Sequence, residues 1–291
     1  MIKIKNILTS LILLLSIAGY SQINYTSMAY GFYQEKNFDS AQVYIDSAVV
    51  SVYESNFSKT WQLRGVIYRN LEDSRGVSAR ESAIESFVKS KEVDTLNEYD
   101  EQIANYLYSI NIRYYNDAVA FLTANELENA ERSYTTYKSN FDSILFIKQD
   151  FSKQDVEFYT VLGGAWFKRN LEVDYDKKPE VYNNAIKAFS KALLIDSLNY
   201  SANYGIGISY YNQGADFITT MNPFETSLDE INSIQNESIE MFKKGEPYLK
   251  RAFEINPNEK EVVEGLTGIY YSLNEDDEYN YFKSLLEKME E

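Results

Sequence analysis

Histidine and cysteine are both absent from this chain of 291 residues. Without them there is no Ser–His or Cys–His nucleophile pair, no imidazole for acid–base catalysis, and none of the usual zinc ligand sets. The absence of cysteine also means that no disulfide supports the fold, so packing of the core must do so. We therefore expect a protein that is not an enzyme and that uses no cofactor and no bound metal.

Phosphate-binding loops are also missing. Neither GxxxxGK[ST] nor GxGxxG occurs, and Gly205 and Gly207 lie at helical positions with no strand before them, which predicts a role in helix packing. Carboxylates are the remaining acid–base candidates, and a pair of them could in principle hydrolyse a glycosidic bond. The densest clusters, Asp174 with Asp176 and residues 275–278, fall in or beside predicted turns. Solvated loops or helix caps are the simpler interpretation, and a hydrolase using Asp174, Asp176 and Glu264 is a remote one.

Basic residues are scarce relative to acidic ones. The chain has 28 Lys and Arg against 44 Asp and Glu, for a formal net charge of −16. Nucleic acids and anionic lipid surfaces attract basic proteins, so this balance argues against both as partners. The sequence does not specify an oligomeric state.

The first 22 residues are typical of a secretory signal peptide. Lys3 and Lys5 precede an apolar core at residues 7–18, which is too short to span a bilayer, and small residues follow it. No cysteine follows the apolar core, so a lipid anchor is not expected. We predict export to the periplasm or the medium, with no membrane insertion after cleavage; an uncleaved anchor is the alternative.

A pattern of small and aromatic residues recurs in the remaining chain. At residues 184–211, Ala185, Phe189 and Ala192 share one helix face, a turn follows, and Gly205 and Tyr210 lie in the next apolar segment. This spacing predicts one helix, a tight turn and a second helix, which is the unit of a stacked helical array.

The same order appears elsewhere. Trp61, Gly65 and Tyr68 are followed by a second small–aromatic segment at Ala83 and Phe87. This W…G…Y order resembles the tetratricopeptide repeat (TPR), of the type found in exported proteins of Bacteroidetes. The resemblance implies an all-α fold: a right-handed α-solenoid of about five to six helix–turn–helix repeats over residues 23–291. The approximate repeat units are 23–57, 58–97, 98–152, 153–198, 199–258 and 259–291.

Several segments depart from the repeat. Residues 71–80 predict a turn longer than the family's, while residues 170–180 and 214–242 read as insertions. Pro179 suits the first turn of a helix, and Ser227 followed by Glu230 predicts a capping box. Pro247 lies inside an apparent helix and should kink or interrupt it.

The resemblance also implies where a ligand binds. In TPR proteins the first helix of each repeat lines a concave groove. The positions of this chain that map to the groove are Tyr30, Tyr33, Arg69, Asn70, Tyr115, Lys168, Arg169, Tyr204, Tyr211, Asn212 and Tyr271. We expect a scaffold that binds a partner protein or peptide there, although these tyrosines could instead pack between helices. The alternative function is a glycan-binding module or an accessory to cell-envelope polysaccharide handling.

An Asp-Ser/Thr-small or apolar triad occurs five times. It resembles the O-glycosylation acceptor motif of exported Bacteroidetes proteins, which makes Ser40, Ser47, Thr95, Ser143 and Ser197 candidate acceptors. Asp, Ser and Thr are also common at turns and helix ends, which gives the simpler explanation.

Overall fold

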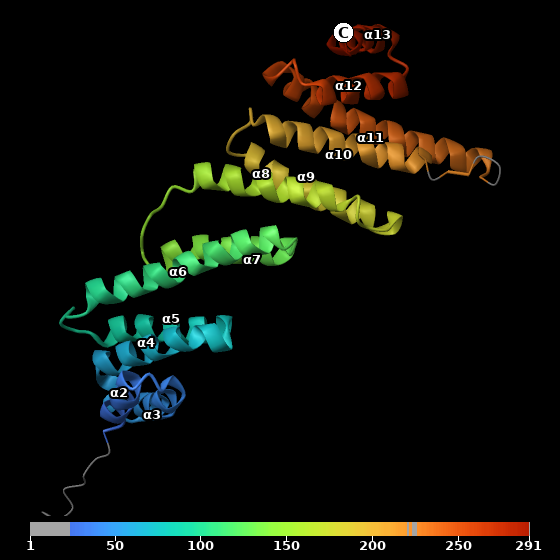
Figure 1. The fold of residues 1–291 in the computed structure, drawn as a ribbon. Helices are drawn as coiled ribbons and strands as arrows, with labels where there is room; N and C mark the ends of the chain where they lie inside the picture. The colour runs from blue at the N-terminus through green and yellow to red at the C-terminus, as the bar shows by residue number, and fades with distance from the viewer. Residues whose placement is uncertain (1–23, 220, 223–225, 291) are drawn as a thin grey trace, which may run out of the picture. The chain divides into compact units, whose positions relative to one another are not determined.

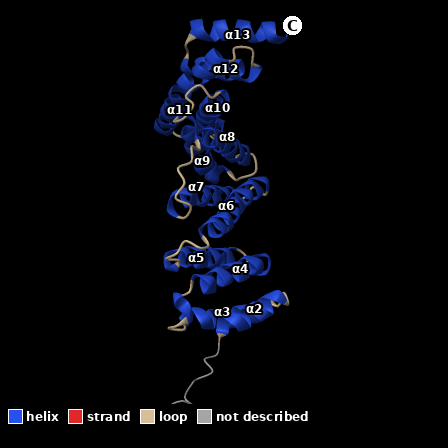
Figure 2. Cartoon of the chain, turned by 90° about the vertical axis from the view of Figure 1, so that its left-hand side faces the viewer, coloured by secondary structure: helices blue, strands red, loops and turns tan. Residues whose placement is uncertain are grey.

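A computed structural model describes residues 24–219, 221–222 and 226–290, and these residues are helical throughout most of their length (Figure 1). They form twelve α-helices and two short 3-10 helices, and no strand occurs among them (Figure 2). The all-α prediction is confirmed. Among these helices none is both long and apolar enough to cross a membrane. The predicted signal peptide lies outside the described residues.

The helices follow one another along the chain as six consecutive pairs. The pairs are α2 (Tyr25–Gln34) with α3 (Phe38–Val50), α4 (Ser58–Arg75) with α5 (Val77–Val93), α6 (Asp100–Thr123) with α7 (Leu127–Ser143), α8 (Ser152–Arg169) with α9 (Lys178–Leu193), α10 (Tyr200–Thr219) with α11 (Leu228–Ile255), and α12 (Lys260–Leu273) with α13 (Asp276–Glu290). The 3-10 helices are η1 (Glu54–Asn56) and η2 (Tyr175–Lys177).

The chain divides into two compact units. The N-terminal unit comprises the described residues up to Arg113 together with Asp142–Phe146, and the C-terminal unit comprises the described part of the rest. In the N-terminal unit, Ile45, Ile67 and Phe87 are among the fully buried residues of one core. In the C-terminal unit, Leu249 and Tyr270 belong to a second core.

Glycines let large side chains reach the axis of a neighbouring helix. A Cβ added to Gly65 of α4 would lie 2.7 Å from the ring of Phe87 on α5. In the C-terminal unit, Phe189 of α9 lies between Gly163 of α8 and Gly205 of α10, and a Cβ on either glycine would collide with its ring. The glycines of the repeat are therefore packing positions, as the sequence predicts.

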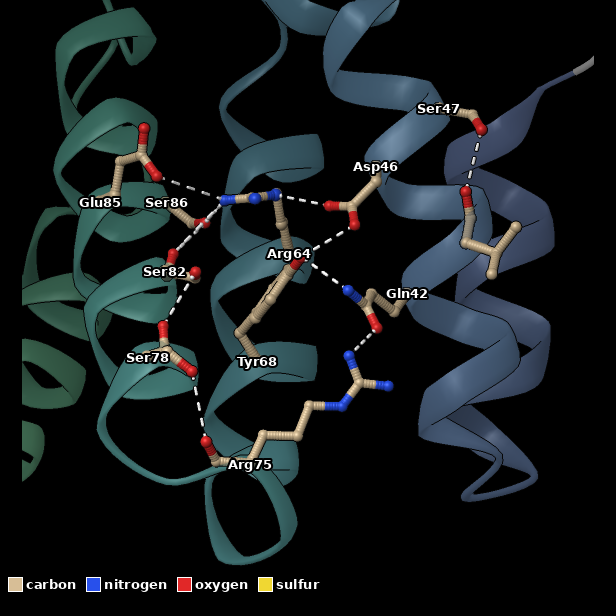
Figure 3. Close-up of polar contacts among 11 residues, drawn as sticks. Gln42, Asp46, Ser47, Arg64, Tyr68, Arg75, Ser78, Ser82, Glu85 and Ser86 are labelled. Atoms are coloured by element: carbon tan, nitrogen blue, oxygen red, sulfur yellow. Dashed lines mark hydrogen bonds and ion pairs between the residues drawn. The ribbon is translucent and has the colours of Figure 1, made fainter.

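A polar network joins three helices of the N-terminal unit (Figure 3). Arg64 of α4 donates from Nε to Asp46 of α3 at 2.9 Å and from Nη1 to Ser86 of α5 at 2.7 Å. The Tyr68 hydroxyl donates to the other Asp46 carboxylate oxygen at 2.8 Å and accepts from Gln42 at 2.8 Å. The shared carboxylate fixes the first repeat against the second.

The expected long turn at residues 71–80 is wrong. α4 and α5 each continue into this segment and meet at Gly76, whose φ of 71° and ψ of −153° suit glycine. The buried carboxylate of Glu72 accepts a hydrogen bond from Arg80 at 2.6 Å and pairs with Arg113 of α6. These ion pairs of Glu72 link the last turns of α4 to the first turns of α5 and to α6.

The two predicted insertions contact each other in the C-terminal unit. Asp216 of α10 accepts hydrogen bonds from Lys178 at 3.0 Å and from the Tyr182 hydroxyl at 2.9 Å. Just before Asp216, a Cβ on Gly214 would lie 2.8 Å from Phe242 of α11. Most of segment 214–242 therefore lengthens the α10–α11 pair.

The local helix signals are mostly confirmed. Pro179 lies in the first turn of α9, and Ser227 and Glu230 form the predicted capping box of α11. An interruption of α11 at Pro247 is wrong, because the helix continues to Ile255. Gly245 and Leu249 on either side of the proline are buried against α10, and that packing offsets the lost backbone hydrogen bond.

Candidate functional site in the N-terminal unit

A cleft of about 590 Å³ opens on the first helices of the first three repeats. Its lining comes from α2, from η1 and the residues beside it, from α4 and from the start of α6. Its lining residues are Asn24, Thr26, Ser27, Tyr30, Tyr33, Tyr53, Glu54, Phe57, Lys59, Thr60, Gln62, Leu63, Val66, Gln102 and Tyr106. Helical spacing places them there: Leu63 and Val66 are three residues apart on α4, and Gln102 and Tyr106 are four apart on α6.

Three aromatic side chains of the cleft are exposed. Tyr30 is 48% exposed, Tyr53 60% and Phe57 46%. The rings of Tyr53 and Phe57 meet edge to face with centroids 5.0 Å apart. Exposed aromatics gathered around a hollow are the usual composition of a contact site, because they bury a large apolar area at little entropic cost.

Glu54 of η1 lines the cleft and caps α2. Its carboxylate accepts hydrogen bonds from the backbone N–H groups of Tyr25 and Thr26 at 3.1 and 2.8 Å, and from the Thr26 hydroxyl at 2.6 Å. The side chain is buried. A carboxylate at a helix N-terminus is stabilised by the unpaired N–H groups and the helix dipole, so its charge is largely compensated.

Glu54→Ala should therefore lower the free energy of unfolding by about 2 kcal/mol, since three donors lose a charged acceptor. Urea unfolding followed by circular dichroism measures the change. Glu85→Ala is the matched control: this exposed carboxylate lies 3.8 Å from Arg64, and its loss should cost less than about 0.5 kcal/mol. Equal effects of the two changes would contradict the capping role.

Two cations at the cleft have no carboxylate partner. Lys59 is exposed at the cleft wall, and Arg69 stacks on the Tyr106 ring at 5.5 Å from its centroid. Neither takes part in any ion pair among the described residues, and the buried Nε of Arg69 has no hydrogen-bond acceptor there. By contrast, two amides of the lining are partners: Gln62 donates a hydrogen bond to Gln102 at 2.8 Å.

Four of the predicted groove residues lie on the helices of this cleft. Tyr30 and Tyr33 line it, Arg69 touches its Tyr106, and exposed Asn70 follows on α4, where its amide donates to the Val66 carbonyl at 2.7 Å. The structure brings these four together within the N-terminal unit. Their role in binding stays a prediction.

The other seven groove residues lie in the C-terminal unit, where several contact the interior. Tyr115 lies 5.3 Å from Tyr137 between ring centroids, Tyr204 is stacked on Tyr200, and Tyr211 lies against Phe242 at 5.6 Å. Burial raises the pKa of the hydroxyls of Tyr204 and Tyr211.

The rest of the seven are polar or exposed. Arg169 covers Trp166 at 5.2 Å, and Asn212 is half-buried. Lys168 and Tyr271 are exposed. Their part in binding likewise stays a prediction.

Sequence reasoning missed the cleft residues outside the repeat pattern. Tyr53 and Phe57 lie in the connection between α3 and α4, where helical periodicity gives no signal. Tyr106 stacks on Phe87 at 4.9 Å, and its neighbours Ile103 and Leu107 dominate the apolar pattern of α6. A clue was available in residues 50–57, where four exposed apolar side chains precede a helix.

A second cavity, of about 700 Å³, lies between α7, α9 and Trp166 in the C-terminal unit. Its two carboxylates are already paired: Glu131 accepts from Lys191 of the lining at 2.5 Å, and Glu128 lies 3.7 Å from Arg169 outside it. Trp166 is buried, so no aromatic face is offered. The N-terminal cleft is the better candidate.

The five candidate O-glycosylation positions differ in environment. Thr95 and Ser197 are exposed in connections between helix pairs, and Ser143 is exposed at the end of α7. Ser40 and Ser47 lie within α3 and are half-buried, and the Ser47 hydroxyl donates to the Val43 carbonyl at 2.9 Å. Modification at all five stays a prediction. The exposed residues Thr95, Ser143 and Ser197 are the more accessible candidates.

Comparison with known proteins gives structural likenesses and no sequence family. No family model matches the chain, and no curated protein matches it. It is similar to the crystal structure of a TPR repeats protein from Bacteroides fragilis, with 16% identity and a TM-score of 0.41 over 90% of this chain and 97% of that one.

Two structures of a monomeric IFIT1 mutant are also similar. The one with m7Gppp-AAAA has 13% identity and a TM-score of 0.37 over 90% of this chain, and the one with Gppp-AAAA has 11% and 0.38 over 92%. The chain spans 58% and 60% of those two chains. At these identities and TM-scores the likeness does not extend to function.

Proposed function

We propose that this chain is a non-enzymatic, exported scaffold that binds a peptide segment of a partner protein in the N-terminal cleft. The observation that supports it most is the set of exposed aromatics, Tyr30, Tyr53 and Phe57, around one hollow of about 590 Å³. Buried aromatic anchors supply most of the binding energy at protein interfaces. A groove on consecutive first helices also suits an extended chain.

The lining favours a peptide over a glycan. Sugar recognition needs polar side chains with free hydrogen-bonding groups, and here the Glu54 carboxylate is already occupied by α2 while Gln62 is bonded to Gln102. The lining offers mainly aromatic and aliphatic faces, with Lys59 at its wall and Arg69 beside it. Such surfaces match the apolar and acidic side chains of a polypeptide.

The test is selection from a phage-displayed library of random twelve-residue peptides against the immobilised intact chain. Selected peptides are then measured by fluorescence anisotropy. We expect Tyr30→Ala with Phe57→Ala to weaken their binding at least tenfold, since each change removes an exposed anchor of the cleft.

The matched control is Tyr281→Ala, because Tyr281 is a similarly exposed tyrosine on α13 in the C-terminal unit. It should leave binding unchanged, and all variants should keep their helical circular dichroism. Failure to select any peptide, or binding that resists the double change, would overturn the proposal.

A further inference from the structure

We infer that the peptide held in the N-terminal cleft carries two carboxylate side chains, four or five residues apart, on either side of an apolar residue. This inference rests on the proposed function and specifies its ligand. It follows from the positions of Lys59, which lines the cleft, and Arg69, which lies over the cleft residue Tyr106; neither has an ion-pair partner among the described residues.

The one acid of the cleft lining is occupied, whereas its one lysine and the neighbouring Arg69 have no ion-pair partner among the described residues. Glu54 is the acid of the lining, and its carboxylate is held by the N-terminus of α2, so it does not pair with Lys59. The other arginines of the N-terminal unit each pair with a carboxylate, as Arg64 does with Asp46 at 2.9 Å. With a net charge of −16, unpaired cations at an aromatic hollow are a specific feature of this surface.

Arg69 is the more constrained of the two. Its guanidinium lies over Tyr106, whose other neighbour is the Phe87 ring, and its Nε is buried with no acceptor. A buried donor without an acceptor costs about 1–3 kcal/mol. A carboxylate that binds the guanidinium supplies charge and acceptors together, which makes this the stronger of the two anion positions.

The spacing of the two cations sets the spacing in the ligand. Lys59 and Arg69 are ten residues apart on α4, which places them about 15 Å apart along the helix axis and about 80° apart around it. An extended peptide covers about 3.3 Å per residue, so four or five residues bridge that length. Leu63 and Val66 lie between the two cations in the sequence of α4, and with Tyr33 they line the cleft, so they offer the apolar surface for the residue between the two acids.

The same library selection tests this, now read position by position. We expect Asp and Glu to be enriched at least threefold at two positions separated by four or five residues. In anisotropy measurements with one selected peptide, changing either acid to its amide should weaken binding about tenfold, and binding should weaken further with added salt. The peptide changes leave the protein intact, so folding cannot explain their effect.

Protein variants complete the test. A selection against Lys59→Gln/Arg69→Gln should lose the acidic pair, whereas one against Lys36→Gln/Lys243→Gln should keep it, because those exposed lysines lie away from the cleft lining and form no ion pair among the described residues. Cleft-dependent peptides without the acidic pair would overturn this inference and leave the proposed function standing. An acidic pair that persists against Lys59→Gln/Arg69→Gln would overturn it equally, and the absence of any cleft-dependent peptide would overturn both proposals.

Discussion

Gly205→Ala should lower the free energy of unfolding of the C-terminal unit by about 2 kcal/mol. The added Cβ would collide with the ring of Phe189, which is buried. Overpacking a well-filled core costs about 1–3 kcal/mol or more, and the better helix propensity of alanine returns about 1 kcal/mol of it. The ring cannot move aside, because Gly163 of α8 lies on its other side, where a Cβ would be 2.6 Å away.

Gly164→Ala is the matched control for this change. Gly164 follows Gly163 on α8 but is exposed, and a Cβ there would meet nothing within 4 Å. Its replacement should raise stability by up to about 1 kcal/mol. Urea unfolding at neutral pH measures both variants, with the expected change in the midpoint opposite in sign.

A compensating change makes the cause specific. Adding Phe189→Leu to Gly205→Ala should recover part of the lost stability, because the smaller side chain gives room to the new methyl group. Phe189→Leu alone should be destabilising, since it leaves a space between two glycines. Equal stability of Gly205→Ala and the unchanged chain would show that the three helices are packed less closely than described.

The fold was predictable because small and aromatic residues recur at helical spacing within each repeat. Ala185, Phe189 and Ala192 recur at three and four residues, and each is buried in α9 as that spacing requires. The lengths of the pairs were less predictable. Gly76 is both the C-cap of α4 and the N-cap of α5. The residues on either side of it, which the sequence suggested were a loop, are therefore helical.

The residues of the candidate site were predictable where they occupy positions of the repeat pattern, and the others were not. Tyr30 and Tyr33 follow from their place on a first helix. The capping of α2 by Glu54, 29 residues from Tyr25, depends on two segments meeting in space, and no local pattern records it. The same holds for Arg69, whose unpaired state becomes visible when the positions of all carboxylates in the N-terminal unit are known.

Buried tyrosines should make the protein unusually sensitive to alkaline pH. Burial raises the pKa of Tyr134 far above its ordinary value of 10, and the hydrogen bond to Asp155 at 2.8 Å raises it further. Burial likewise raises the pKa of Tyr182, and the hydrogen bond to Asp216 raises it further. For Tyr270, burial raises the pKa to about 12 despite neighbouring Lys250.

The sign of the pH dependence follows from these raised values. Below pH 10 the hydroxyls are protonated in both the folded and the unfolded chain, so the stabilising contribution is complete. Above pH 10 the unfolded chain loses these protons while the folded chain keeps them, and stability falls by about 1.4 kcal/mol per pH unit for each such tyrosine. For Tyr270 the loss extends from pH 10 to about pH 12, and for Tyr134 and Tyr182 it extends beyond that.

Urea unfolding at pH 8, 10, 11 and 12 measures the expected loss, which for the three tyrosines together approaches about 4 kcal/mol per pH unit. Exposed tyrosines ionise while the chain is still folded, so the last part of the tyrosinate absorbance should rise with loss of helix, when the buried hydroxyls ionise. Tyr134→Phe keeps the ring against Phe158, and Lys138 still pairs with Asp155 at 2.5 Å. That variant should therefore show a shallower decline above pH 10 than the unchanged chain, and an identical decline would remove Tyr134 from the explanation.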